Sequence, residues 1–126
     1  MLSRRQEKFS RLIQKELGLY FLNEGKKIFG NLMISVTQVI VSPDLGYAKI
    51  YLSFLNEKDH EKAIATIKEH AGEVKRNFGL RIRNDVRKIP QISFFYDDTL
   101  DYIEKIDDLF KKLHDKEDQN KNNTIE

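Results

Sequence analysis

Basic side chains recur at helical spacing near the N-terminus of this chain. Arg4, Lys8, Arg11 and Lys15 are spaced i, i+4, i+7 and i+11, and Arg5 lies beside them. At about 100° per residue these side chains fall on one stripe of a helix, nearly opposite an apolar stripe. Guanidinium and ammonium groups neutralise phosphates, and counterion release drives such binding. A solvated helix face is the alternative explanation, but few acidic residues interrupt the stripe.

A second basic group lies in the middle of the sequence. Arg76, Arg83 and Arg87 are spaced i, i+7 and i+11, so they share one face if a single helix continues that far. Three more basic residues flank them: Lys75, Arg81 and Lys88. A solvated helix back is again the alternative. Because two separate helices carry such a stripe, we predict that both contact the phosphates of a nucleic acid through one merged surface.

The net charge of +2 hides a polarised distribution of charge. Residues 1–30 contain seven basic and three acidic residues, and residues 73–90 contain six and two. Residues 91–126 contain five basic and ten acidic residues. A local positive face can bind a polyanion even when the whole chain is nearly neutral.

Aromatic residues offer a further mode of nucleic-acid binding. Tyr47, Tyr51, Phe94 and Tyr96 lie on predicted strands, where aromatic rings can stack on bases. In a domain of this size most aromatic side chains fill the core, so packing is the favoured explanation for this set.

Residues that could support catalysis form no recognisable constellation. His60, His70 and His114 lack metal-ligand spacing, and no phosphate-binding or nucleophile motif occurs. The carboxylates at 97–101 and 107–108 are better explained by helix capping and a solvated surface than by a metal site. The absence of cysteine excludes disulfides and thiolate metal sites. We therefore predict neither enzyme activity nor a metal or cofactor.

Length and composition favour one small domain without a membrane span. The chain has 126 residues, of which 40% are hydrophobic and 33% charged. No apolar run approaches the ~20 residues that cross a bilayer, and the N-terminus has no apolar signal core. We expect a cytoplasmic monomer.

Alternating apolar residues predict two strands after an N-terminal helix. The helix is expected over 3–23, followed by strands over about 32–41 and 46–55. The alternation slips near Gln38, which suggests a bulge. Residues 42–46 contain Pro and Gly and favour a turn.

The second half predicts a long helical region, a strand and a last helix. Asp59 is a candidate N-cap, and an apolar stripe continues from there into the 80s. Gly72 lies within this stripe, although glycine is unfavourable inside a helix. A bend, close packing or a contact with a ligand would explain a glycine there. A third strand over 91–96 follows this crossover, so parallel pairing is expected. A helix over 99–114 ends the domain 1–114, and the polar tail 115–126 is expected to be disordered. This order predicts an α+β fold with helices packed on one face of a three-stranded sheet.

Two motifs resemble the ribosome-binding factor A family. They are Val41-Ser42-Pro43-Asp44-Leu45-Gly46-Tyr47-Ala48-Lys49-Ile50-Tyr51-Leu52-Ser53 and Ile89-Pro90-Gln91-Ile92-Ser93-Phe94-Phe95-Tyr96-Asp97-Asp98. The basic helix after Ser3 and the helix with Ala71-Gly72 fall in the family's order and spacing. The resemblance covers about residues 3–114.

This resemblance implies a type II KH-like fold, α-β-β-α-α-β plus a C-terminal helix. A helix-kink-helix with an Ala-x-Gly element replaces the usual Gly-x-x-Gly loop that clamps nucleotide backbone. Here Ala71 and Gly72 belong to that kink, but His70 stands at the position of the first alanine. Gly72 would then set a bend that orients the basic half of the helix.

The resemblance also implies a function without catalysis. Members bind the 30S subunit and support late 16S rRNA maturation, 5′-end processing and growth in the cold. Two alternatives stay open. One is a protein-binding adaptor whose acidic last helix binds a ribosomal protein or another assembly factor. The other is an RNA-cleaving enzyme, which the lack of an acid-base constellation disfavours.

Overall fold

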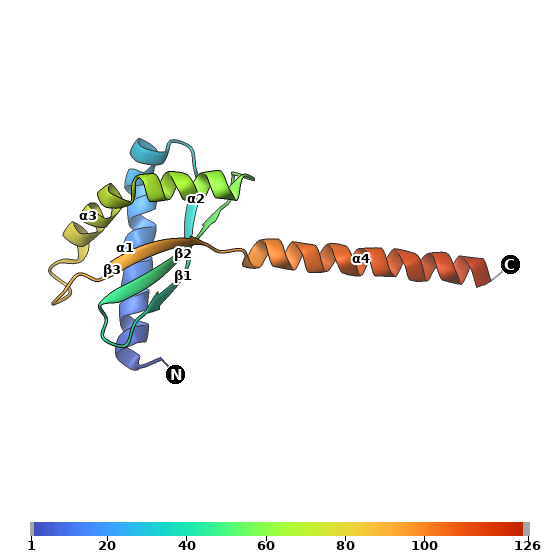
Figure 1. The fold of residues 1–126 in the computed structure, drawn as a ribbon, viewed down its shortest axis with the longest axis horizontal. Coiled ribbons are helices and arrows are strands. Elements are labelled where there is room, and N and C mark those ends of the chain that lie inside the picture. Colours follow the sequence, from blue (N-terminus) through green and yellow to red (C-terminus); the bar gives the residue numbers. More distant parts are fainter. Residues whose placement is uncertain (1, 125–126) are drawn as a thin grey trace.

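The computed structural model describes the backbone of residues 2–124 and the side chains of residues 2–99 and 101–115. The elements follow the predicted order (Figure 1). They are α1 (Arg4–Phe29), β1 (Ile34–Val41), β2 (Tyr47–Phe54), α2 (His60–Glu69), α3 (Ala71–Ile82), β3 (Gln91–Tyr96) and α4 (Thr99–Thr124).

The three strands form one sheet in the order β1-β2-β3. β1 and β2 pair antiparallel, and β2 and β3 pair parallel, as predicted from the helical crossover. The register between β1 and β2 shifts between Val36 and Gln38, which confirms the predicted bulge. Leu45 takes a positive φ of 61° in the turn, where Asp44 accepts hydrogen bonds from the Ser42 hydroxyl at 2.6 Å and the Gly46 amide at 3.1 Å.

Helix α1 begins at a capping box and is fixed to the sheet by one buried amide. The Ser3 hydroxyl accepts from the Gln6 backbone N–H, and the Gln6 side chain accepts from the Ser3 N–H. Gln6 Nε2 also donates to the Val41 carbonyl at 2.9 Å. The helix continues to Phe29, so the predicted end of this helix at residue 23 is wrong. Gly25 is buried there, against the Phe21 side chain, and the helix ends instead at Gly30 with φ of 64°.

One face of the sheet is covered by helices and the other is not. The inward-facing strand residues and one side of the helices form a single apolar core, with Ile13, Leu17, Ile50, Leu52 and Ile67 fully buried. In Figure 1 the strands lie in front of α1, on the side turned toward the viewer. The period-two pattern of the strands is the physical cause, because it places apolar side chains on only one face.

The long helical region is broken at His70. Asp59 caps α2 as predicted, with its side chain accepting from the Lys62 N–H at 3.1 Å. α2 ends at Glu69, and His70, with φ of −100° and ψ of 13°, is both its C-cap and the N-cap of α3. Ala71 and Gly72 lie in the first turn of α3, so the prediction that they form the kink is wrong: the break lies one residue earlier, at His70.

Helix α4 is longer than predicted and projects away from the domain (Figure 1). It continues to Thr124 and so includes most of the segment 115–126 that was predicted to be a tail, while residues 125 and 126 lie outside the described residues. Lys, Glu and Gln cost little in a helix that is already nucleated, which is consistent with the extension. Within the described residues, no helix is long and apolar enough to cross a membrane.

Candidate nucleic-acid interface

The five basic residues predicted to form a stripe on α1 are all exposed to solvent. Arg4, Arg5, Lys8, Arg11 and Lys15 are exposed, and the core side of the same helix carries buried residues instead, namely Phe9, Ile13, Leu17 and Tyr20. The predicted opposition of a basic and an apolar stripe on α1 is therefore present.

The second basic group is also exposed, but it does not lie on one helix. Lys75, Arg76 and Arg81 belong to α3, and Arg83 is its C-cap. A turn follows, in which the Asp85 N–H donates to the Ile82 carbonyl at 2.8 Å. Arg87 and Lys88 therefore lie in the loop before β3, and the prediction that Arg87 shares a helix face with Arg76 is wrong. Asn84 and Asp85 favour such a turn over helix.

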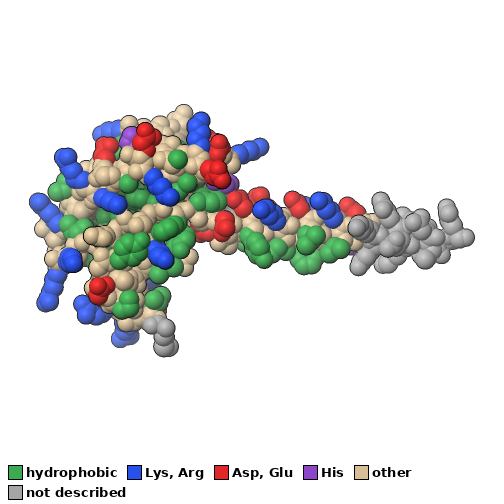
Figure 2. Space-filling view, viewed as in Figure 1, with side chains coloured by type: hydrophobic (Ala, Val, Ile, Leu, Met, Phe, Trp, Pro, Cys, Tyr) green, Lys and Arg blue, Asp and Glu red, His purple; other side chains and the backbone are tan. Residues whose placement is uncertain are grey.

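Side-chain contacts hold α3 beside α1. Arg81 Nε lies 3.1 Å from Glu16 Oε2, and Asn77 Nδ2 donates to the Tyr20 hydroxyl at 3.1 Å. The helices that carry the two basic groups are therefore neighbours. In Figure 2, Lys and Arg side chains gather around the end of the domain away from α4, whereas acidic side chains line one side of α4. Arg81 is less available for phosphate than the other arginines, because Glu16 already pairs with it. The merging of both groups into one binding surface stays a prediction.

The environment of Gly72 narrows the reasons for a glycine at that position. Its φ lies outside the left-handed region, so backbone conformation does not require glycine. A Cβ built on Gly72 would have no atom within 4 Å, apart from its own chain neighbours and helix backbone, so packing does not require it either. The bend itself lies at His70, whose ring packs edge-on against Phe29 with the centroids 5.5 Å apart. Of the three reasons considered for Gly72, contact with a ligand is the one left.

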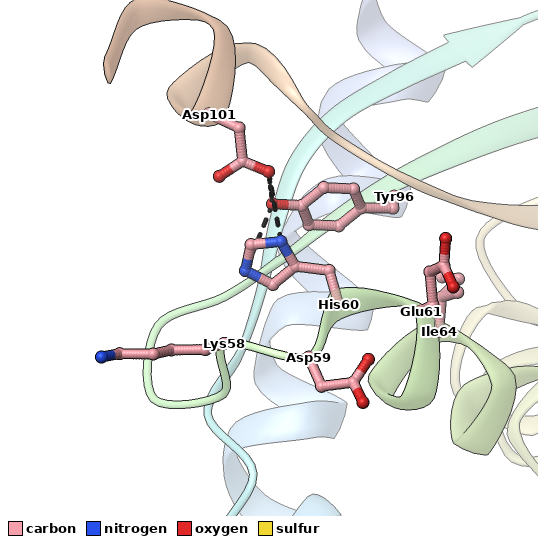
Figure 3. Close-up of a pocket in the computed structure, with 7 residues that line it drawn as sticks. All are labelled: Lys58, Asp59, His60, Glu61, Ile64, Tyr96 and Asp101. Carbon is pink, nitrogen blue, oxygen red and sulfur yellow. Dashed lines mark hydrogen bonds and ion pairs between the residues drawn. The ribbon is translucent and has the colours of Figure 1, made fainter. Parts of the chain in front are cut away.

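A cluster of His60, Tyr96 and Asp101 joins the start of α4 to the domain (Figure 3). Tyr96 donates its hydroxyl hydrogen to Asp101 Oδ2 at 2.7 Å, and His60 Nδ1 lies 3.1 Å from the same oxygen. The rings of His60 and Tyr96 stack with centroids 4.4 Å apart. These residues line a shallow cavity of about 390 Å³. Burial, and then the hydrogen bond to Asp101, raise the pKa of Tyr96 well above its usual value, so its hydroxyl stays a donor.

Sequence analysis missed this cluster. It assigned the carboxylates near residue 100 to capping and solvation, which is correct for Asp97: Asp97 accepts from the Thr99 N–H at 3.0 Å. Nothing in the spacing of His60 and Asp101 reveals that they meet, because β3 brings them together over a long sequence separation. The cluster links the first turn of α4 to β3 and α2. Among the described side chains, no group of three or more His, Asp or Glu residues could hold a metal ion.

Comparison with known proteins places these features in one family. The family model for ribosome-binding factor A matches residues 5–110. The chain is also 45% identical over 122 residues to ribosome-binding factor A of Cytophaga hutchinsonii, covering 95% of this chain and 92% of that protein. The chain belongs to the ribosome-binding factor A family.

Solved structures of ribosome-binding factor A share this fold. The crystal structure of the protein from Thermus thermophilus covers 72% of this chain and 94% of its own, with a TM-score of 0.56 and 16% identity. A Thermus thermophilus homology model fitted into the cryo-EM map of a 30S complex with the factor covers 70% and 90%, with a TM-score of 0.53 and 17% identity. The type II KH-like fold, α-β-β-α-α-β with a helix-kink-helix and a C-terminal helix, is thus confirmed.

Proposed function

We propose that this protein is a cytoplasmic assembly factor that binds the immature 30S subunit and supports late maturation of 16S rRNA, including processing of its 5′ end. It acts without catalysis: it holds or remodels RNA, and a nuclease trims the ends. Membership of the ribosome-binding factor A family carries this proposal. A member from Thermus thermophilus has been fitted into the map of a 30S complex, which supports the same partner here.

The basic residues of α1, α3 and the loop before β3 are the proposed phosphate contacts. They are exposed, they lie on neighbouring helices, and ten of the eleven have no acidic partner within salt-bridge distance among the described side chains; Arg81 is the exception. If about six phosphates are engaged, the logarithm of the binding constant should fall with the logarithm of salt concentration with a slope of about −4 to −5.

The test reverses two arginines outside the contact between α1 and α3. In the variant with Arg76→Glu and Arg83→Glu, we expect weaker co-sedimentation with immature 30S particles and a salt slope reduced by about two. The matched control carries Lys105→Glu and Lys111→Glu on α4, with the same change in charge, and should bind as the unchanged protein does. Undiminished binding by the arginine variant would remove these residues from the interface.

A protein-binding adaptor is the second candidate, and α4 favours it. Exposed apolar side chains follow one side of this helix with no partner in the described part of the chain, among them Ile103, Leu109, Phe110 and Leu113. Acidic residues line the opposite side of the helix (Figure 2), namely Asp101, Glu104, Asp107 and Asp108. A basic ribosomal protein with an apolar groove would match both features.

Substitution on α4 separates the two candidates. The full-length variant with Ile103→Ser and Phe110→Ser should lose binding to ribosomal protein from RNase-treated particles if the adaptor is correct. Its affinity for protein-free 16S rRNA should not change. Loss of binding to the free RNA instead would assign α4 to the RNA interface and exclude the adaptor.

A further inference from the structure

The face of the sheet that no helix covers carries two aromatic rings and a lysine. Outward-facing positions alternate with core positions along the strands, and the register places Tyr51 of β2 beside Phe95 of β3. Lys49 precedes them on the same face, because it lies two residues before Tyr51. We call Lys49, Tyr51 and Phe95 the sheet platform. Of the four aromatic residues predicted as candidates for stacking, only Tyr51 belongs to the platform, and Phe94 lies in the core.

The platform is built as a stacking surface. The rings of Tyr51 and Phe95 have centroids 5.6 Å apart and planes inclined by 30°. Lys49 Nζ lies 6.0 Å from the centroid of Phe95, at the outer limit of a cation–π contact. Phe95 keeps 37% of its surface exposed, Lys49 is exposed, and Tyr51 is half-buried. Both rings therefore keep part of their surface open to solvent, and a cation lies over Phe95.

Charge differs between the two ends of this face. At one end Thr37, the extra residue of the bulge, donates across β2 to Asp97 Oδ2 at 2.5 Å. Hydrogen bonds from Thr37 and then Thr99 lower the pKa of Asp97, so this end carries a fixed negative charge. Toward the other end lies Lys49, and the β1–β2 turn beyond it carries Asp44, whose pKa is lowered by hydrogen bonds from Ser42 and Gly46 and, to a smaller extent, by the charge of Lys88. A phosphate backbone would follow the lysine side and avoid the Asp97 end.

We propose that the sheet platform stacks unpaired bases of single-stranded RNA. The inference extends the proposed RNA-binding function to a second surface, on the sheet and separate from the basic helices. Base stacking on aromatic rings is tolerant of sequence, because every base has a π face, and a neighbouring cation neutralises the adjoining phosphate. Polar side chains of Gln38, Gln91 and Ser93 surround the rings, and Ile40 and Tyr47 add limited apolar surface on the same face. Such a rim suits hydrated nucleotides better than the broad apolar area that a protein partner needs.

The test compares ring-removing and ring-retaining variants of the full chain. The double variant Tyr51→Leu with Phe95→Leu keeps apolar side chains but removes both π faces. Its affinity for a fluorescent single-stranded oligoadenylate should fall by about fivefold or more for each ring. Its affinity for an abasic oligomer of the same length and charge, and its salt slope, should stay unchanged. Lys49→Glu should weaken binding of both oligomers.

A second variant keeps the proposal testable if the leucine variant folds poorly. Phe95→Trp retains a ring and introduces the chain's only tryptophan, so oligoadenylate binding should quench its fluorescence while the abasic oligomer should not. Equal affinity of the folded leucine variant for oligoadenylate, or absence of quenching, would overturn the proposal. A protein dimer in sedimentation that the leucine variant abolishes would also overturn it, by assigning the face to a second copy. Binding of immature 30S particles through Arg76 and Arg83 is measured separately, so its failure would concern only the proposed function.

Discussion

Replacement of Gly72 by alanine should make the protein more stable and bind RNA more weakly. Gly72 is exposed, lies in the first turn of α3 and has a φ outside the left-handed region. Its added Cβ would meet no atom of the rest of the chain within 4 Å. Within the folded protein the substitution therefore has no steric cost, and glycine is kept at the expense of stability.

The size of the stabilisation follows from backbone entropy. Glycine in a helix costs about 0.5–1 kcal/mol relative to alanine, partly through the greater freedom of the unfolded chain. Because Gly72 is near the helix start, we expect a value at the lower end of that range. For a folded unit of about 100 residues, this gain raises the melting temperature by about 2–5 °C.

The binding result tests why glycine is there. If RNA backbone approaches Gly72 closely, the new methyl group displaces it, and a loss of about 1.4 kcal/mol corresponds to a tenfold weaker affinity. Urea unfolding and co-sedimentation with immature 30S particles measure the two effects separately. Gly18→Ala is the matched control, because Gly18 is also helical and its added Cβ also meets no atom within 4 Å. A less stable Gly72→Ala protein would refute the structural reasoning, and a stabilised variant with unchanged RNA affinity would refute the close approach.

Two further predictions concern the junction of α4. Tyr96→Phe removes the hydrogen bond to Asp101 and should lower the free energy of unfolding by about 1 kcal/mol in urea titrations at neutral pH. The pKa of Tyr96 is raised in the folded protein, so the stability that this residue contributes is complete below the unfolded pKa of about 10 and is lost as pH rises above it. Above that pH, the melting temperature of the unchanged protein should therefore fall more steeply than that of the Phe variant. Equal slopes would contradict the role of burial. Thr37→Val removes a hydrogen bond that lowers the pKa of Asp97 in the folded protein. The stability that ionised Asp97 contributes is present above its unfolded pKa of about 3.9 and is lost as pH falls through its lower folded pKa. Melting temperatures from neutral pH down to pH 3 should converge for the two proteins, and a constant difference would exclude this linkage.

The sheet and the core could be predicted because local patterns determine them. The alternation of β1 and β2 assigns each side chain to one face, and the slip near Gln38 marks the bulge that the register confirms. The helical crossover between β2 and β3 favours parallel pairing, which the structure also has. These features depend on period and connection length, and both can be counted along the chain.

The helix break and the surface contacts could not be predicted in the same way. Gly72 has the lower helix propensity, yet the chain bends at His70, where Phe29 of α1 provides a ring contact. Glu16 pairs with Arg81 across 65 residues of sequence, and this contact reduces the availability of one predicted phosphate ligand. Propensity is local, whereas these outcomes depend on which helices become neighbours after the core forms.

The orientation of α4 separates the basic surface from the acidic helix. The apolar row of α4 is compatible with a helix that covers its own sheet and with one that faces outward, so the sequence does not indicate the orientation. In the structure, the contact of Asp101 with Tyr96 and His60 holds the helix start beside β3 and α2. With 26 residues at about 1.5 Å each, the helix extends far beyond the Debye length of about 8 Å at physiological salt. Its distal acidic residues therefore cannot weaken phosphate binding at α1 and α3. A helix packed back onto the domain would place the same carboxylates near the proposed RNA site, so the outward orientation is compatible with both the proposed phosphate contacts and the candidate adaptor surface on α4.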